Sequence, residues 1–221
     1  MNTNIQIDWQ SIDHVFLDMD GTLLDLHFDN HFWQQVLPME YARINGLTVE
    51  SALASLVPKF ESKQGQLDWY CVDYWSRELD IDVMRLKYKN PQKISLRPGV
   101  FELLDAIKKL AAEPALLTNA HRSVVDFKFD KTGLGQAIDK IHCSHDYGHP
   151  KESPAFWVRF SDTVKFDPAR TLFIDDSEPV LEAAEQFGVK WLRSISAPDS
   201  RQPRNAPSRF PEIDQFSDIF N

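Results

Sequence analysis

The sequence predicts an α/β protein with a doubly wound parallel sheet and a helical insertion after its first strand. Short apolar runs that end in polar or acidic residues alternate with helix-like segments along most of the chain, and this alternation is typical of βαβ units. The runs are almost continuously apolar, as expected for strands buried on both faces of a parallel sheet. The stretch from Leu26 to about Leu96 differs, because it contains few strand signals.

Each core element is predicted from one such run or segment. The predicted strands are His14–Asp18, Ala115–Asn119, Ile138–Ser144, Thr171–Asp176 and Val189–Arg193. The predicted helices are Val100–Ala112, Ser123–Thr132, Pro154–Val164 and Glu178–Phe187. A segment rich in Pro, Ser, Asp and Arg, Ala197–Pro211, precedes a short terminal element around Ile213–Phe220. Ligands of such sheets bind beyond the carboxyl ends of the strands, so the polar residues that close the runs are expected to meet there.

The insertion is interpreted as a helical cap, residues 26–94, seated over the carboxyl edge of a core formed by residues 1–25 and 95–221. Thr48 is predicted to cap a helix that runs through Leu56, and Asp68 is predicted to cap a helix over Trp69–Leu79.

The cap is rich in aromatic residues. They include Trp33, Trp69, Tyr70, Tyr74 and Trp75. Because Tyr70 and Tyr74 are four residues apart, as are Cys71 and Trp75, most of these rings are expected to pack in the cap's own core. One of these rings, which the sequence does not specify, is expected to face the substrate.

The composition excludes several classes of protein. The 221 residues include 33 acidic and 24 basic side chains, a formal net charge of −9, with no basic stripe of the kind that binds nucleic acid. The two cysteines have no close spacing, which argues against a disulfide framework. The N-terminus lacks the features of a signal peptide, and no apolar run reaches the roughly 18–20 residues that span a bilayer. A cytoplasmic protein without a membrane partner is therefore expected; monomer and homodimer both stay open.

The segment Asp18-Met19-Asp20-Gly21-Thr22 directly follows the first predicted strand. Residues two apart on an extended chain project to the same side, so both carboxylates can address one reacting centre. Asp18 could attack phosphorus as a nucleophile, while Asp20 protonates the leaving alkoxide and later accepts a proton from water. Gly21 permits a tight turn whose amides approach a phosphate. Taken alone, the segment is equally consistent with a solvated turn.

Three further sites at the ends of predicted strands strengthen this interpretation. Thr118 and Asn119 could bind phosphate oxygens, although both residue types also cap helices. Lys151 could neutralise phosphate and nucleophile, although an isolated lysine is more often a surface residue. Asp175 and Asp176, together with Asp18, form an oxygen-rich set suited to Mg²⁺. Two adjacent acids at a buried edge repel each other unless a cation compensates them, whereas helix capping explains only one of the pair.

These motifs, in this order over nearly the whole chain, resemble the phosphatase branch of the haloacid dehalogenase (HAD) superfamily, which carries a helical cap after the first motif. The resemblance implies a HAD-like Rossmannoid core, with Asp18 as the nucleophile and Asp20 as the general acid and base. It also implies phosphate binding by Thr118, the family's lysine at Lys151, and Mg²⁺ as cofactor. Asp175 and Asp176 become the metal acids, with Asp176 preferred for direct contact and Asp20 contributing its backbone carbonyl.

Longer segments resemble the bacterial GMP/IMP nucleotidase family. They are residues 18–26, 28–33, 69–75, 117–121 and 171–178. This resemblance implies hydrolysis of purine 5′-mononucleotides to nucleoside and phosphate. Stacking of a purine on one of the aromatic rings of the cap is physically reasonable. Asp29, Asn30 and Asp73 are the candidates for reading the base edge.

Several alternatives stay open at this point. The substrate could be a sugar phosphate or another small phosphate monoester, and the reaction could be that of a phosphomutase. A dehalogenase would need neither the metal nor the second acid, and an inert relative would be expected to lose Asp18, Asp20 or Lys151. The cluster of His142, Cys143, His145 and His149 suggests zinc, but a strand-to-loop transition suffices to explain it, and structural zinc needs four ligands in fixed geometry.

Overall fold

A computed structural model describes residues 6–110, 112–203 and 206–220 of the chain. The described residues form a six-stranded sheet in the order β3-β2-β1-β4-β5-β6, and every neighbouring pair is parallel. The strands are β1 (His14–Leu17), β2 (Glu113–Thr118), β3 (Lys140–Cys143), β4 (Thr171–Asp175), β5 (Trp191–Ile195) and β6 (Glu212–Ile213). All predicted strands are confirmed, and β6 begins the predicted terminal element. Three parts of the predictions lie outside the described residues. They are residues 1–5 of the predicted core, position 111 of the predicted helix, and positions 204–205 of the predicted surface segment.

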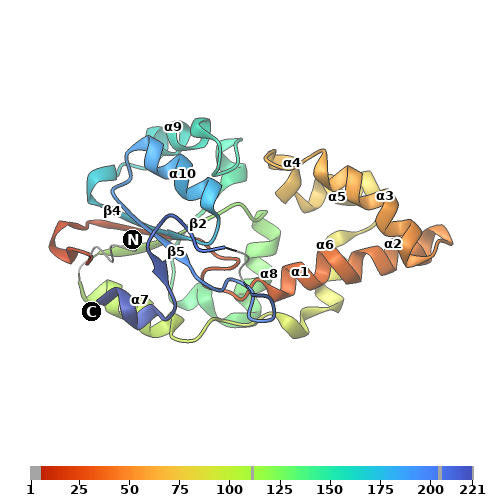
Figure 1. The fold of residues 1–221 in the computed structure, drawn as a ribbon, viewed down its shortest axis with the longest axis horizontal. Helices are drawn as coiled ribbons and strands as arrows, with labels where there is room; N and C mark the ends of the chain where they lie inside the picture. Colours follow the sequence, from red (N-terminus) through yellow and green to blue (C-terminus); the bar gives the residue numbers. More distant parts are fainter. Residues whose placement is uncertain (1–5, 111, 204–205, 221) are drawn as a thin grey trace.

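Helices cover both faces of the sheet. They are α7 (Val100–Lys109) and α8 (Arg122–Thr132) on one face, and α9 (Pro154–Thr163) and α10 (Glu178–Phe187) on the other. Figure 1 shows α9 and α10 on one side of the strands and α7 on the opposite side. Val15 and Leu17 of β1 pack in the α7–α8 layer, whereas Phe16 packs in the α9–α10 layer. The predicted doubly wound core is confirmed.

The topology places the carboxyl ends of β1 and β4 at the centre of the sheet. The chain leads from β1 to β2 and β3 on one side and then returns to β4 on the other side of β1. Ligand sites of open α/β sheets lie where the strand order reverses in this way. Asp18 is the first residue after β1, and Asp175 is the last residue of β4.

A second, helical region lies to one side of the sheet (Figure 1). It contains α1 (His27–His31), a π-helical turn (Phe32–Val36), α2 (Leu37–Asn45), α3 (Val49–Glu61), α4 (Leu67–Tyr70), α5 (Val72–Leu79) and α6 (Val83–Lys89). Its apolar core includes Phe32, Leu56 and Trp75 and continues onto Val124 of α8. No strand of residues 26–94, all described, joins the sheet. Among the described residues, none of the helices has the length and apolar character that a bilayer crossing requires.

One helix of this region differs from its prediction. Thr48 caps α3 as predicted, since its Oγ1 accepts from the Ser51 amide at 3.2 Å. Asp68 does not cap a helix over Trp69–Leu79, because the chain leaves the helical conformation at Cys71 (φ −90°, ψ 107°) and starts again as α5. The prediction was wrong, and two bonds between residues close in sequence accompany the break. The Asp68 carboxylate pairs with Lys63 at 2.9 Å, and the break lets the Trp75 indole donate to the Trp69 carbonyl at 2.9 Å.

The same break separates the aromatic pairs that were expected on one helix face. Tyr70 ends α4, whereas Tyr74 and Trp75 lie on α5. Their packing is therefore set by contacts between helices. Trp75, for example, contacts the Phe60 ring of α3 with centroids 4.9 Å apart.

The chain crosses twice between the sheet and the helical region, and the two crossings are bonded to each other and to the segment after β5. The Asp25 amide donates to the Ser95 carbonyl at 3.0 Å. The Leu26 amide donates to the Pro198 carbonyl at 2.9 Å, and the Ser200 amide donates to Asp25 Oδ1 at 3.1 Å. Segment 197–200 therefore lies against the first crossing.

Candidate active site

The loop after β1 is folded so that Asp18 stays attached to the sheet. The Asp18 amide donates to the Ile174 carbonyl of β4 at 3.0 Å, and the Gly21 amide donates to the Leu24 carbonyl at 2.8 Å. Gly21 has φ +91°, and a Cβ at this position would lie 2.5 Å from Asp176 Oδ2. Both the backbone conformation and the close approach of Asp176 therefore require glycine.

Lys151 is fully buried beneath Asp18. Its Nζ donates to Asp18 Oδ1 at 2.6 Å, to Asp175 Oδ2 at 2.6 Å and to the Leu117 carbonyl at 2.9 Å. Burial disfavours the ammonium form, yet Asp175 and Asp18 outweigh it and hold the pKa of Lys151 above its usual range. Lys151 is 1% exposed, so the alternative of a surface lysine does not apply.

Carboxylate oxygens of Asp18, Asp175 and Asp176 lie within 4.8 Å of one another, and with Lys151 we call this group the acid cluster. Burial raises the pKa of Asp18 to about 6 and raises that of Asp175. Burial, Asp175 and Asp18 together raise the pKa of Asp176 well above its ordinary value. The cluster combines three carboxylates with one ammonium, a formal charge of −2 when all are ionised. A divalent cation with oxygen ligands fits this donor set and charge.

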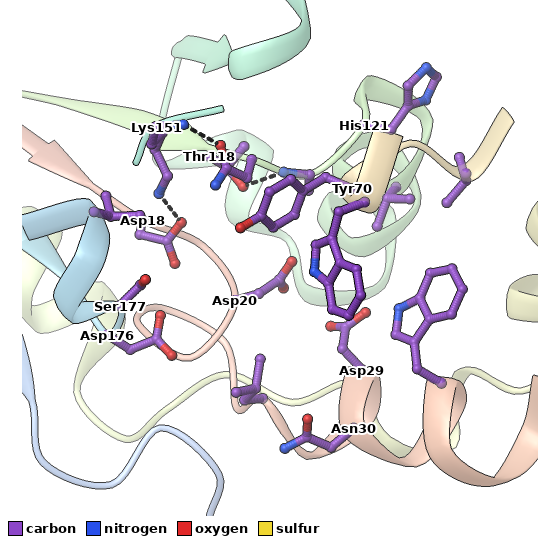
Figure 2. A pocket seen from close by; sticks show the side chains of 18 of the residues that line it. Asp18, Asp20, Asp29, Asn30, Tyr70, Thr118, His121, Lys151, Asp176 and Ser177 are labelled. Carbon is purple, nitrogen blue, oxygen red and sulfur yellow. Dashed lines mark hydrogen bonds and ion pairs between the residues drawn. The ribbon is translucent and has the colours of Figure 1, made fainter. Parts of the chain in front are cut away.

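Asp176 is the member of the acid cluster best placed to contact a cation directly. Both oxygens of Asp175 are already engaged, Oδ2 by Lys151 at 2.6 Å and Oδ1 by the Ser177 amide at 2.9 Å. Within the described part of the chain, no lysine, arginine or histidine pairs with Asp176. Figure 2 shows the Asp176 carboxylate facing the same space as Asp18.

Thr118 and Asn119 lie at the carboxyl end of β2, beside Asp18. Thr118 Oγ1 accepts from the Ala120 amide at 3.0 Å, which leaves its hydroxyl hydrogen for an acceptor in the cavity. The Asn119 side chain bonds to protein groups on both sides. Its Oδ1 accepts from the Lys151 amide at 2.9 Å, and its Nδ2 donates to Glu152 Oε2 at 3.0 Å. Asn119 therefore holds the Lys151 loop in place.

Glu152 also connects this loop to the helical region. The Tyr70 hydroxyl of α4 donates to Glu152 Oε1 at 2.9 Å. Figure 2 shows the Tyr70 ring reaching toward the space between Thr118 and Asp20. Sequence reasoning did not identify Glu152, because a glutamate next to a lysine after a proline has no distinguishing pattern.

Asp20 belongs to a different group of buried charges. Lys128 Nζ of α8 contacts Asp20 Oδ1 at 2.6 Å and Asp29 Oδ2 of α1 at 2.5 Å, and Lys87 Nζ of α6 contacts Asp29 Oδ1 at 3.0 Å. We call these four residues the paired cluster. Burial raises the pKa of Asp20 to about 6. Burial also acts to raise the pKa of Asp29, but the positive charges of Lys128 and Lys87 have the larger effect and lower this pKa to about 2.

A cavity of about 440 Å³ joins the two clusters. Its walls come from the carboxyl edge of the sheet and from the helical region, and the ring side chains that line it are Trp33, Phe60, Trp69, Tyr70, Trp75 and His121. More than one ring of the helical region thus borders the cavity. Trp33, Trp69, Tyr74 and Trp75 also pack in the apolar core of that region, as expected for most of these rings. Of the base-edge candidates, Asn30 lines the cavity and donates to Asp199 at 2.7 Å, whereas the oxygens of Asp29 are bound by the two lysines. The Asp73 side chain is 61% exposed and faces His121.

The comparisons with known proteins decide the family. The family model described as haloacid dehalogenase-like hydrolase matches residues 12–188. The chain belongs to the haloacid dehalogenase-like hydrolases. It is 38% identical over 213 residues to GMP/IMP nucleotidase YrfG of Escherichia coli (strain K12), covering 96% of each chain. It is also 27% identical over 180 residues to a phosphoglycolate phosphatase of Pseudomonas savastanoi pv. phaseolicola, covering 79% of this chain and 66% of that one.

The fold of this hydrolase agrees with that assignment. The HAD phosphatase from Thermococcus onnurineus superposes with a TM-score of 0.76 at 18% identity, covering 94% of this chain and 96% of that one. The Rossmannoid core with its helical cap is therefore confirmed, and the protein is a phosphatase of the HAD-like family. The structure brings all the predicted site residues to one edge of the sheet. Asp18, Asp20, Thr118, Asn119, Lys151, Asp175 and Asp176 all line the same cavity.

Proposed function

We propose that this HAD-like phosphatase hydrolyses purine 5′-mononucleotides, GMP and IMP above all, through an aspartyl-phosphate on Asp18 with Mg²⁺ as cofactor. The observation that carries the proposal is the arrangement at the base of the cavity. The Asp18 carboxylate is held by Lys151 at 2.6 Å within a set of three acids, while Asp20 lines the same cavity from a separate charge cluster.

Asp18 supplies the nucleophile of the first step. Lys151 binds Oδ1, which leaves Oδ2 to form a bond to phosphorus while the bond from phosphorus to the ester oxygen breaks. Asp20 donates a proton to the departing nucleoside alkoxide. Because its pKa is raised to about 6 by burial, a useful fraction of Asp20 is protonated near neutral pH.

Water completes the reaction in the second step. Asp20, now a carboxylate, accepts a proton from a water molecule whose oxygen bonds to phosphorus as the bond to Asp18 breaks. Inorganic phosphate leaves, and Asp18 returns to its carboxylate form. The Thr118 hydroxyl is proposed to donate to a phosphate oxygen in both steps. The Lys151 ammonium is proposed to act through its charge, because its three N–H groups already bind Asp18, Asp175 and the Leu117 carbonyl.

Asp18, Asp176 and the Asp20 backbone carbonyl are the groups proposed to hold Mg²⁺, with Asp175 fixed behind them by Lys151 and Ser177. When bound, the cation would offset the charge that builds up on the phosphate and carboxylate oxygens.

The aromatic wall of the cavity supports a nucleotide rather than a small polar ester. Rings of Trp33, Trp69 and Tyr70 line the same cavity as the acid cluster, and base–aromatic stacking contributes about 1–3 kcal/mol per base. The similarity to the E. coli GMP/IMP nucleotidase supports the 6-oxopurine preference. GMP and IMP share a purine 6-oxo group and a protonated N1, whereas AMP presents the opposite hydrogen-bond pattern there.

The test is a panel of phosphate monoesters assayed with Mg²⁺ and again after chelation with EDTA. We expect kcat/KM for GMP and IMP to exceed that for AMP and pyrimidine nucleotides by roughly 10- to 100-fold, because a mismatched base edge leaves buried groups unpaired. EDTA is expected to remove activity. Highest kcat/KM for AMP or a hexose phosphate would overturn the nucleotide assignment, and full activity in EDTA would overturn the metal requirement.

A phosphatase of sugar phosphates or other small esters is the second candidate, favoured by the similarity to a phosphoglycolate phosphatase. The same panel distinguishes it. A phosphomutase would isomerise a sugar phosphate without net release of inorganic phosphate.

A further inference from the structure

The paired cluster contains a lysine that the reaction outlined above does not use. Lys128 lies on α8, is 1% exposed, and places its Nζ 2.6 Å from Asp20 Oδ1 and 2.5 Å from Asp29 Oδ2. It thus bridges the loop after β1 and the first helix of the helical region.

The second partner of Lys128, Asp29, has a lysine partner of its own. Asp29 is held by Lys87, whose Nζ is 3.0 Å from Asp29 Oδ1 and 4.1 Å from the centre of the Phe32 ring. Lys87 is also 1% exposed. The two carboxylates and two ammonium groups balance in charge, so Lys128 keeps its position without a further ion.

We propose that Lys128 is a positioning residue for Asp20, which rests on the proposed function of Asp20 as general acid and base. Lys128 binds Oδ1 and turns the carboxyl group so that Oδ2 carries the transferred proton. Within the described residues, no hydrogen bond to Asp20 Oδ2 is formed, so this oxygen is available to the substrate. Asp29 Oδ2 binds the same ammonium group from the other side.

The loop position of Asp20 explains why it needs such a support. Its side chain is 20% exposed at the cavity, and the carboxylates of Asp29 and Asp18 repel it. A misplaced proton donor costs rate, since proton transfer requires hydrogen-bond distance to the leaving oxygen. An ammonium group on a packed helix fixes the donor more precisely than the loop alone can.

The proposal predicts a dependence on the leaving group. A nucleoside 5′-alkoxide leaves only with the proton from Asp20, which becomes a carboxylate paired with the Lys128 ammonium. A p-nitrophenolate ion is stable without that proton. Loss of positioning therefore slows cleavage of the alkyl ester and spares the aryl ester, whereas general damage to the site slows both.

The experiment measures single-turnover rates of alcohol release from GMP and from p-nitrophenyl phosphate. If another alkyl phosphate proves the better substrate, it replaces GMP. For Lys128→Met we expect a loss of about 10- to 100-fold with the alkyl ester, part of the full effect of general acid catalysis, and a loss of less than about threefold with the aryl ester. The variant should fold, because Asp29 keeps Lys87 as a partner; thermal unfolding checks this.

Lys87→Met is the matched control. Lys87 has the same side chain, the same burial and the same partner Asp29, but it does not contact Asp20. We expect Lys87→Met to change the cleavage rates of the two esters by equal factors.

Equal losses on both esters in Lys128→Met, or the same selective loss in Lys87→Met, would overturn the positioning role while leaving the phosphatase assignment intact. A wild-type protein that cleaves neither ester would overturn the proposed function and this inference with it.

Discussion

The two charge clusters that border the cavity solve the problem of buried charge in different ways. The acid cluster has three carboxylates against Lys151, a formal charge of −2. The paired cluster has two carboxylates against Lys87 and Lys128 and is neutral. Burial of unbalanced charge is costly, and the raised pKa of Asp176 reflects that cost.

The difference indicates which cluster is complete within the protein. The paired cluster has all its partners on the chain, so it can hold side chains in a fixed arrangement before any ligand arrives. The acid cluster has one positive charge against three negative ones, so a cation and a phosphate ester can be accommodated there together. Three experiments test this contrast.

The largest effect is expected from Asp18→Asn in the acid cluster. The amide is nearly isosteric but a far poorer nucleophile, so we expect kcat to fall by at least about 1,000-fold. Circular dichroism and thermal unfolding should show an intact fold. Asp130→Asn, the same change at an exposed position of α8, is the control and should retain wild-type kcat. Undiminished phosphate release from Asp18→Asn would contradict the nucleophile role.

A smaller effect, on stability, is expected from Asp29→Asn in the paired cluster. The pKa of Asp29 is lowered to about 2, so its charge stabilises the folded state above its ordinary pKa of about 3.9. The variant should lose about 2–3 kcal/mol of unfolding free energy at pH 7. This difference should shrink as pH falls from about 4 towards 2, because the wild-type carboxyl becomes protonated there. Urea unfolding at several pH values measures it; a pH-independent loss would point to packing rather than charge.

The smallest effect is expected from Asp176→Asn. Unlike Asp29→Asn, this substitution should increase the free energy of unfolding. Since burial and the two neighbouring carboxylates oppose its charge, removing that charge should stabilise the metal-free protein by about 1 kcal/mol, or raise Tm by about 2–4 °C. Addition of Mg²⁺ should raise the Tm of the wild type but not that of the variant. A variant that is less stable without metal, or that keeps the Mg²⁺ shift, would refute the view that the acid cluster awaits a cation.

The acid cluster could be predicted from the sequence because local patterns determine it. Continuous apolar runs define β1 and β4, and parallel strands present their carboxyl ends at one edge. Asp18 and Asp175 close those runs, so their proximity follows from the fold class. The glycine at position 21 adds a local turn signal.

The paired cluster could not be predicted in the same way. Lys128 reaches partners 108 and 99 positions away, and Lys87 reaches one 58 positions away, so no local pattern connects them. One weak signal existed, since Lys128 stands between Phe127 and Phe129. Buried residues at three successive positions mean that this part of α8 is covered on more than one side, by the sheet and by the helical region.

The break at Cys71 was missed for a related reason. The i, i+4 spacing of the rings fits a continuous helix, and the segment lacks the glycine or proline that usually marks an interruption. The bond from the Trp75 indole to the Trp69 carbonyl compensates the broken helix, and only the packed structure contains it.

The bonds between the chain crossings and segment 197–200 have a mechanical consequence. Any rotation of the helical region about residues 25–26 must strain or break the bonds from the Pro198 carbonyl and the Ser200 amide. The resistance to such a rotation therefore depends in part on a segment that belongs to neither crossing. A chain shortened after β5 would keep every carboxylate of both clusters but would lose the brace that limits how far the two walls of the cavity can separate.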